Sequence, residues 1–287
     1  IQTYTLTYTA GAGGSISGSS PQTVVHGGSG SAVVAVPDAG YSFVQWSDSS
    51  VANPRTDTAV TADLAVSAEF VLVPAVGFTP GNIVVYRVGD GSANLSSAAT
   101  RIFLDEIDAV SGGVVQSVPL PTAVSGDQLR CLGNGTSAAE GMVSRSVDKA
   151  YLVGGCYDQA PGASSSAGAR VVFRVGADAV IDTSTVLTDL TSGSPRTVAS
   201  TDGNAYWMAG NNFTRHIEHG DDTSALLTGS VNGRVAQIFD GQLYVSAASA
   251  INAIGSGLPT DGPQTASPVR SVSGGGIYGY FFADLSA

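Results

Sequence analysis

Short apolar runs separated by turn-forming residues recur along this chain. The clearest lie between residues 81 and 121, at Ile83–Val88, Arg101–Ile107 and Val114–Val118, with Gly, Ser, Asn and Asp between them. Runs of β-branched and aromatic residues bounded by turn formers predict β-strands. Three such strands in one short unit predict an antiparallel meander, and the rest of the chain repeats this pattern in weaker copies.

Residues 1–73 carry a separate group of strand-like runs. They are Tyr4–Tyr8, Ser15–Gly18, Ser31–Pro37, Gly40–Trp46 and Leu64–Phe70. In the fourth run, one face of the strand would carry Tyr41, Phe43 and Gln45, and the other would carry Ser42, Val44 and Trp46. We expect the large side chains to form the core of a small domain, namely Tyr41, Phe43, Trp46 and Phe70.

The same residues carry a family resemblance. The segments Gly40–Asp48, Asn53–Asp57, Val60–Asp63 and Val66–Phe70 follow one another at spacings that resemble the divergent internalin-type B-repeat, also called the Listeria–Bacteroides repeat. The resemblance covers roughly residues 3–71, and one departure is Ser49-Ser50, where the family often has Gly. It implies a small β-grasp-like module of bacterial surface and secreted proteins, which serves as a spacer or adhesion unit and has no known catalytic residues.

Three residues of this module are also candidates for a ligand site: Trp46, Asp48 and Arg55. We favour a structural role for them. Trp46 is expected in the core, and Asp48, like Asn53-Pro54, is typical of turns.

Residues 74–80 contain two prolines and predict a short, semi-rigid linker, which leaves residues 81–287 as a second module. Four segments of this module resemble one another: 144–153, 198–208, 236–245 and 272–281. Each contains a short strand, a turn and a second strand with a tyrosine; the tyrosines, which we expect in the core, are Tyr151, Tyr206, Tyr244 and Tyr278. The turns Asp202-Gly203 and Asp240-Gly241 are strong hairpin signals.

The spacing of these segments predicts a β-propeller. A unit of about 40 residues with four strands is typical of propeller blades. Further strand-like runs follow at 169–175, 179–187, 213–218, 224–227 and around 250–254. The first unit, 81–121, lacks an opening strand. The module resembles kelch-like propeller regions of bacterial surface proteins, with about four and a half blades.

The last half blade would end in the apolar run Ile277–Phe282. An unpaired strand of this kind is an aggregation hazard, so we expect it to be paired. Its partner would be the rest of its own propeller, a cleaved C-terminal piece or another chain. The sequence does not begin with Met and has no signal peptide, so we expect a mature or trimmed fragment.

Composition excludes several classes of partner. The net charge is −11, the pI is about 4.4, and Lys149 is the only lysine. Nucleic-acid binding requires cations that displace phosphate counterions, so we do not expect it. Hydrophobic residues make up 43% of the chain, yet no apolar run approaches the roughly 20 residues of a membrane span.

Cys131 and Cys156 are the two cysteines. They are either two buried thiols or one disulfide. We favour the disulfide, because the composition is that of a secreted β protein, and we expect an extracellular or cell-surface location.

Two polar clusters are candidates for chemistry. His216, Glu218 and His219, with Asp221 and Asp222, are possible zinc or calcium ligands, but His219 would face away from the other two on a strand. We expect a solvated edge there.

Asp105, Glu106 and Asp108 suggest the paired carboxylates of a glycosidase, and only Glu106 and Asp108 would share a face. We expect these acids on an exposed face. We therefore expect no catalytic residue, metal or cofactor.

The function we expect is that of a non-enzymatic, secreted bacterial surface protein. The B-repeat would act as a spacer, and the propeller would bind a protein or glycan ligand. Two alternatives stay open: a structural subunit of an extracellular assembly, and a propeller-type glycan hydrolase or lyase. The ligand, the full blade number and the oligomeric state are not specified by the sequence.

Overall fold

The computed structural model describes residues 1–38, 40–73, 76–273 and 276–283. The chain divides into two compact units, Ile1–Ala75 and Val76–Ala287. Within the described residues, every helix or strand is a β-strand apart from one short 3-10 helix, η1 (Ser165–Ala167). The predicted all-β class is confirmed. Of the predicted linker, residues 74–75 lie outside the described residues, and residues 76–80 pack as part of the second unit.

The first unit contains one more strand than the sequence predicts. Its strands are β1 (Thr3–Ala10), β2 (Gly14–Ser17), β3 (Gln22–Val25), β4 (Val34–Pro37), β5 (Tyr41–Trp46) and β6 (Leu64–Leu72). They form a sheet in the order β3-β1-β6-β5, with β1 parallel to β6, and a separate ribbon of β2 and β4. The additional strand, β3, has only two apolar residues and alternates buried Gln22 and Val24 with exposed neighbours.

A β-bulge in β5 determines how the first core packs. The pairing with β6 shifts between Phe43 and Gln45, so Val44 has no partner of its own. Strict alternation predicted Phe43 and Trp46 on opposite faces, and this was wrong, because the extra residue turns both into the same core. Their ring centroids are 5.9 Å apart. Trp46 is fully buried, and its Nε1 donates a hydrogen bond to the Ala52 carbonyl oxygen at 2.9 Å.

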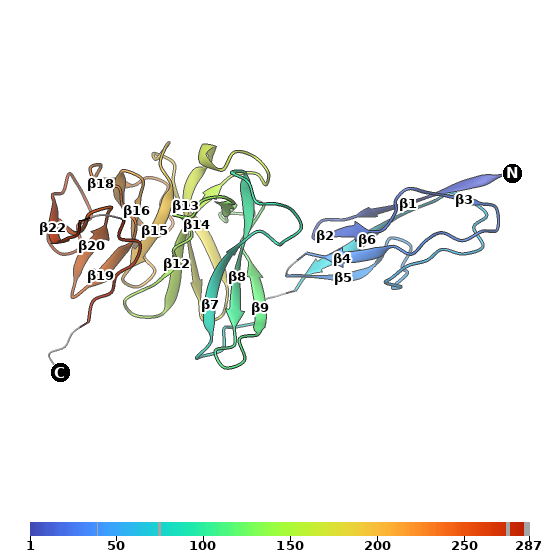
Figure 1. The fold of residues 1–287 in the computed structure, drawn as a ribbon, viewed down its shortest axis with the longest axis horizontal. Helices are drawn as coiled ribbons and strands as arrows, with labels where there is room; N and C mark the ends of the chain where they lie inside the picture. Colours follow the sequence, from blue (N-terminus) through green and yellow to red (C-terminus); the bar gives the residue numbers. More distant parts are fainter. Residues whose placement is uncertain (39, 74–75, 274–275, 284–287) are drawn as a thin grey trace. The chain divides into compact units, whose positions relative to one another are not determined.

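The second unit is a succession of antiparallel meanders. Its strands are β7 (Ile83–Val88), β8 (Ala99–Ile107), β9 (Val114–Pro119), β10 (Leu132–Asn134), β11 (Ser144–Arg145), β12 (Tyr151–Asp158), β13 (Ala169–Gly176), β14 (Ile181–Leu187), β15 (Pro195–Ser200), β16 (Ala205–Gly210), β17 (Phe213–Glu218), β18 (Ala225–Thr228), β19 (Ala236–Phe239), β20 (Gln242–Ser246), β21 (Ala250–Ile254) and β22 (Ala266–Ser271). Figure 1 shows these sheets following one another in chain order, from β7–β9 to β19–β22.

Two of the meanders are complete four-stranded sheets, β15-β16-β17-β18 and β19-β20-β21-β22. A third runs from β11 through β12 and β13 to β14, and β10 joins it to the three-stranded unit β7-β8-β9. The predicted hairpin at Asp240-Gly241 is a two-residue turn with φ of 48° and 67°, as a type I′ turn requires. At Asp202-Gly203 the connection is longer, because β15 ends at Ser200 and β16 begins at Ala205.

Apolar side chains fill the space between successive sheets. Three clusters of buried residues centre on Phe173, on Met208 and on Leu243. Tyr206 is fully buried between sheets, whereas Tyr151 and Tyr244 are half-buried. In the first unit, Phe43 and Phe70 are half-buried and pack against the core that contains Trp46, whereas Tyr41 is half-buried but is not part of that cluster.

The segment at residues 276–283 differs from the prediction. It forms no strand within the described residues, and Tyr278 is 52% exposed, so its predicted place in the core was wrong. Within the described residues the segment does not pair with a neighbouring strand. Instead, its aromatic rings pack against residues of β19 and β20. Phe282 stacks on Phe239 with centroids 4.8 Å apart, and the Tyr280 hydroxyl donates to the Tyr244 carbonyl oxygen at 3.0 Å.

The predicted disulfide is present. Cys131 precedes β10 and Cys156 lies in β12, with a Cα–Cα distance of 5.2 Å. Both residues are buried in the cluster around Phe173, so the covalent link lies in the core that joins the first two meanders.

Removing the disulfide should destabilise the second unit alone. The bond closes a loop between residues 25 positions apart, which corresponds to about 3 kcal/mol in the loop-entropy model. The double variant Cys131→Ser/Cys156→Ser should therefore lower the second unit's unfolding midpoint in calorimetry and leave the first unit's transition in place. Two alkylatable thiols in the unreduced protein would contradict the assignment.

Trp46→Ala should destabilise the first unit by about 3–5 kcal/mol, because a fully buried ring is replaced by a cavity. Differential scanning calorimetry of the full chain should show the first unit's transition lowered or lost. Trp207, buried in the second unit, is then the one remaining tryptophan, and its fluorescence reports that this unit stays folded. Unchanged melting of the first unit would show that Trp46 does not hold its core together.

Candidate functional site

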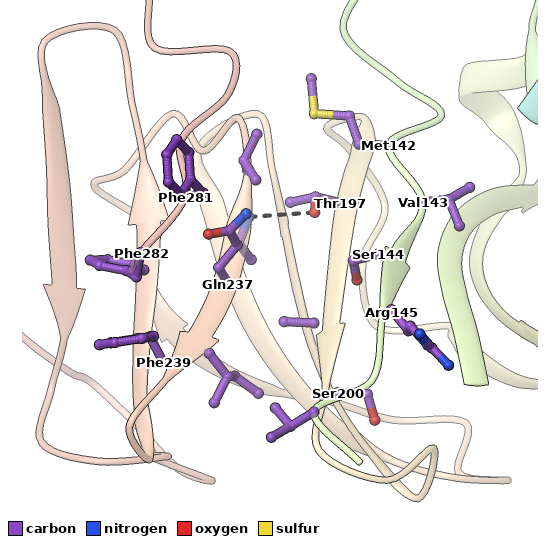
Figure 2. A pocket seen from close by; sticks show the side chains of 15 residues that line it. Met142, Val143, Ser144, Arg145, Thr197, Ser200, Gln237, Phe239, Phe281 and Phe282 are labelled. Atoms are coloured by element: carbon purple, nitrogen blue, oxygen red, sulfur yellow. Dashed lines mark hydrogen bonds between the residues drawn. The ribbon is translucent and has the colours of Figure 1, made fainter. Parts of the chain in front are cut away.

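A hollow lies where the first strands of successive meanders meet. Its volume is about 370 Å³, and three segments and two aromatic residues line it: 142–145 with Val147, Thr197 with Ala199 and Ser200, 235–239, and Phe281 with Phe282. These segments contain or adjoin β11, β15 and β19. Figure 2 shows Phe239, Phe281 and Phe282 on one side and Met142, Ser144 and Arg145 on the other, with Gln237 and Thr197 between them.

The three first strands are held side by side. Met142 pairs with Thr197 in a parallel bridge, and the Val147 amide donates to the Ser200 carbonyl oxygen at 3.1 Å. On the other side of β15, the Ala236 amide donates to Thr197 Oγ1 at 3.4 Å. Small side chains on these strands, such as Ala199 and Ala236, leave the space that the hollow occupies.

The lining combines apolar rings with hydroxyl and amide groups. Ser144, Ser200 and Gln237 supply polar atoms, Arg145 supplies a cation, and no lining residue carries a carboxylate or an imidazole. Gln237 Nε2 donates to the Tyr280 carbonyl oxygen at 2.9 Å, which holds the amide in place. Pockets of this kind, mostly apolar with a few placed polar groups, are suited to binding.

Of the three acids that suggested a glycosidase, Asp105 and Glu106 are buried and Asp108 is half-buried, contrary to the prediction of an exposed face. Asp105 is bound by Arg87, whose Nε and Nη2 lie 2.5 and 3.0 Å from its carboxylate oxygens. Glu106 is fully buried; Oε1 accepts from Thr79 N and Asn82 Nδ2, and Oε2 from Gln116 Nε2 at 2.8 Å.

Burial alone would raise the pKa of Glu106, but these hydrogen bonds outweigh it and hold the pKa below its ordinary value. Asp108 accepts hydrogen bonds from its own turn, including one from Ser111 N at 2.6 Å. The three carboxylates thus have separate structural partners, and the geometry brings none of them to the hollow.

The histidine cluster is not the solvated edge that we predicted. His216 is only 5% exposed and lies against the Trp207 ring, with centroids 5.1 Å apart. His219, on the turn after β17, is half-buried. The described residues contain no group of three or more His, Cys, Asp or Glu arranged to hold a metal ion.

His219 is held between two meanders. Arg174 Nη2 lies 2.8 Å from its Nε2, and an arginine can only donate, so Nε2 accepts and the ring is neutral. Its proton is then on Nδ1, which faces Tyr206 Oη at 3.3 Å and Thr185 Oγ1 at 3.4 Å. Burial and the charge of Arg174 lower the pKa of His219, and Asp182 opposes them.

In the first unit, the candidate residues around Arg55 form a closed ion cluster. Arg55 is buried and donates to both carboxylate oxygens of Asp48, at 2.8 and 2.7 Å, and to both of Asp57, at 2.8 Å. The Tyr8 hydroxyl donates to Asp57 Oδ2 at 2.8 Å. The guanidinium is fully engaged by these partners, so this cluster holds the loops of the module together.

Comparison with known proteins supports part of this picture. Residues 4–74 match the family described as the divergent InlB B-repeat domain, which confirms the resemblance of the first unit. The match does not reach residues 81–287, so the kelch-like resemblance there stays a prediction. No curated protein matches the chain.

Among solved structures, the chain is similar to the periplasmic gluconolactonase of Pseudomonas aeruginosa. The identity is 15%, the alignment covers 100% of this chain and 70% of that one, and the TM-score is 0.40. At this TM-score the similarity carries no weight for either fold or activity.

The second unit should lose stability as the pH falls from about 7.5 to about 5.5. The pKa values of His216 and His219 are both lowered from 6.5, so the unfolded chain binds more protons than the folded one in this range. Urea unfolding at several pH values should show the fall, and His219→Gln should reduce its slope. His26→Gln, in the first unit, is the control and should leave the slope unchanged. A second unit equally stable at both pH values would contradict this account.

Proposed function

We propose that this protein is a non-enzymatic binding module of the bacterial cell surface or secreted space. The B-repeat acts as a spacer or adhesion unit, and the second unit binds a protein or glycan ligand. The observation that carries the proposal is the lining of the hollow. It presents aromatic rings, hydroxyl groups, an amide and an arginine, but no acid or imidazole.

The meanders of the second unit are proposed to be blades of a β-propeller. The first strands of three successive meanders, β11, β15 and β19, lie next to one another, and the sheets that contain them pack face to face through apolar clusters. In propellers the first strands of the blades surround a central channel, and ligands bind at its mouth. On this proposal the hollow is part of the channel wall.

An extracellular location is supported by two independent features. The disulfide between Cys131 and Cys156 is typical of oxidising compartments, and the B-repeat family occurs on surface and secreted proteins. Within the described residues, no helix has the length and apolar character of a membrane span.

The proposal is tested by binding of the full chain to immobilised neutral and acidic oligosaccharides and to extracellular-matrix proteins. Phe239→Ala and Gln237→Ala alter the hollow, and each should weaken binding by about tenfold if its side chain contacts the ligand. Circular dichroism checks that both variants fold. Val114→Ala, on the exposed end of β9, is the control and should bind as the unaltered protein does.

Two results would count against the proposal. Binding that is insensitive to both hollow variants would place the ligand elsewhere. Turnover of an oligosaccharide, detected as new reducing ends, would favour the glycan hydrolase alternative.

A further inference from the structure

Two arginines stand side by side at the start of neighbouring first strands. Arg196 lies in β15 and Arg234 lies two residues before β19. Each stands ten positions before a tyrosine of its meander, Tyr206 and Tyr244, so the repeat places them equivalently. Arg196 Nη1 donates to Asn232 Oδ1 at 2.5 Å and to the carbonyl oxygen of Gly233, next to Arg234, at 2.9 Å.

The positive charges of this pair have no counter-charge in contact. Arg55, Arg87, Arg130, Arg174 and Arg215 all have a carboxylate within 4.0 Å, but within the described part of the chain Arg196 and Arg234 have none. Arg196 is 9% exposed, and the Nε atoms of both arginines are sealed from solvent without a hydrogen-bond partner. A buried charge that is neither paired nor fully hydrogen-bonded is costly, so such a pair calls for an anion.

The electrostatics agree with the geometry. Burial, and then the neighbouring charge of Arg234, lower the pKa of Arg196. Glu140 acts on it from further away, and its Oε1 already accepts a hydrogen bond from the Tyr157 hydroxyl at 3.1 Å. A locally positive site thus exists in a protein whose net charge is −11.

Both arginines keep donors that are unused within the described residues. Arg196 keeps Nη2, and no side-chain nitrogen of Arg234 makes a hydrogen bond within the described residues; its guanidinium carbon lies 4.6 Å from the centroid of the Tyr278 ring. The residues that directly follow the two arginines, Thr197 and Val235, line the hollow. The pair is therefore adjacent in the chain to the proposed ligand site, although neither arginine lines the hollow itself.

We propose that Arg196 and Arg234 together bind one oxyanion, the carboxylate or sulfate of a sugar acid. Guanidinium groups match the two-oxygen edge of such anions and donate charge-assisted hydrogen bonds to it. An anion between the two arginines also adds two attractions that outweigh their mutual repulsion. The sugar part of this assignment rests on the proposed binding function, whereas the anion site itself does not.

The test is calorimetric titration of the full chain with sodium glucuronate and with sodium sulfate at constant ionic strength. Glucose and sodium chloride are the controls. Both oxyanions should bind saturably, and glucose should not. Arg234→Met is the primary variant, because Arg234 makes no side-chain hydrogen bond whose loss would disturb the fold, and it should weaken binding of both anions by about tenfold or more.

Two further variants separate binding from structure. Arg270→Met is a matched control, since Arg270 also stands ten positions before a tyrosine, Tyr280, but is exposed; it should bind as the unaltered protein does. Arg234→Lys keeps the charge without the planar fork and should retain part of the affinity. Without anion, Arg234→Met should melt close to the unaltered protein, because loss of the repulsion from Arg196 offsets loss of the guanidinium contact with the Tyr278 ring.

The anion site is overturned if neither oxyanion binds, or if Arg234→Met binds both as well as the unaltered protein does. Tighter binding of an aspartate-rich peptide than of glucuronate and sulfate would overturn the sugar-acid assignment. These outcomes differ from failure of the proposed function, which is measured on the hollow variants Phe239→Ala and Gln237→Ala.

Discussion

The second unit depends on sheets that are buried on both faces. On β16, Tyr206 and Met208 point into one apolar cluster and Trp207 and Ala209 into the next, so a single strand belongs to two cores. Neither face of such a sheet is stable in water, so an inner meander of this kind requires a neighbour on both sides. This requirement aligns the first strands β11, β15 and β19 and creates the hollow between them.

The same two-sided burial explains how the polar groups behave. On an open sheet the Glu106 carboxylate would be solvated by water. Here it is buried, and it accepts hydrogen bonds from Thr79, Asn82 and Gln116 instead. The alternative, an unpaired buried charge, is costly. Arg196 and Arg234 differ from such satisfied groups: within the described residues neither has a carboxylate in contact, and the buried Nε of each has no hydrogen-bond partner.

The prediction from sequence succeeded where local chemistry decides the outcome. Hairpin turns such as Asp240-Gly241 and the B-repeat spacings could be predicted, because they depend on a few neighbouring residues. The bulge at Val44 could not, because alternation within β5 gives no sign that its register against β6 shifts. The hollow could not be predicted either, since Gln237, Phe239 and Phe282 meet only after three meanders have packed. The repeated spacing between an arginine and a tyrosine was the one feature of the sequence that indicated residues next to the hollow in the chain.

The sequence by itself determined the all-β class and the first unit's family, because strand propensity, turn residues and fixed spacings act over short distances. It also determined the cysteine pairing, because the chain has only two cysteines. Only the tertiary structure decided which side chains are buried, which charges are paired and where residues 276–283 lie. These depend on contacts between segments far apart in the chain: Phe282 finds Phe239 and Tyr244 rather than a partner strand. Burial and pairing are properties of the packed sheets, and no single strand carries them.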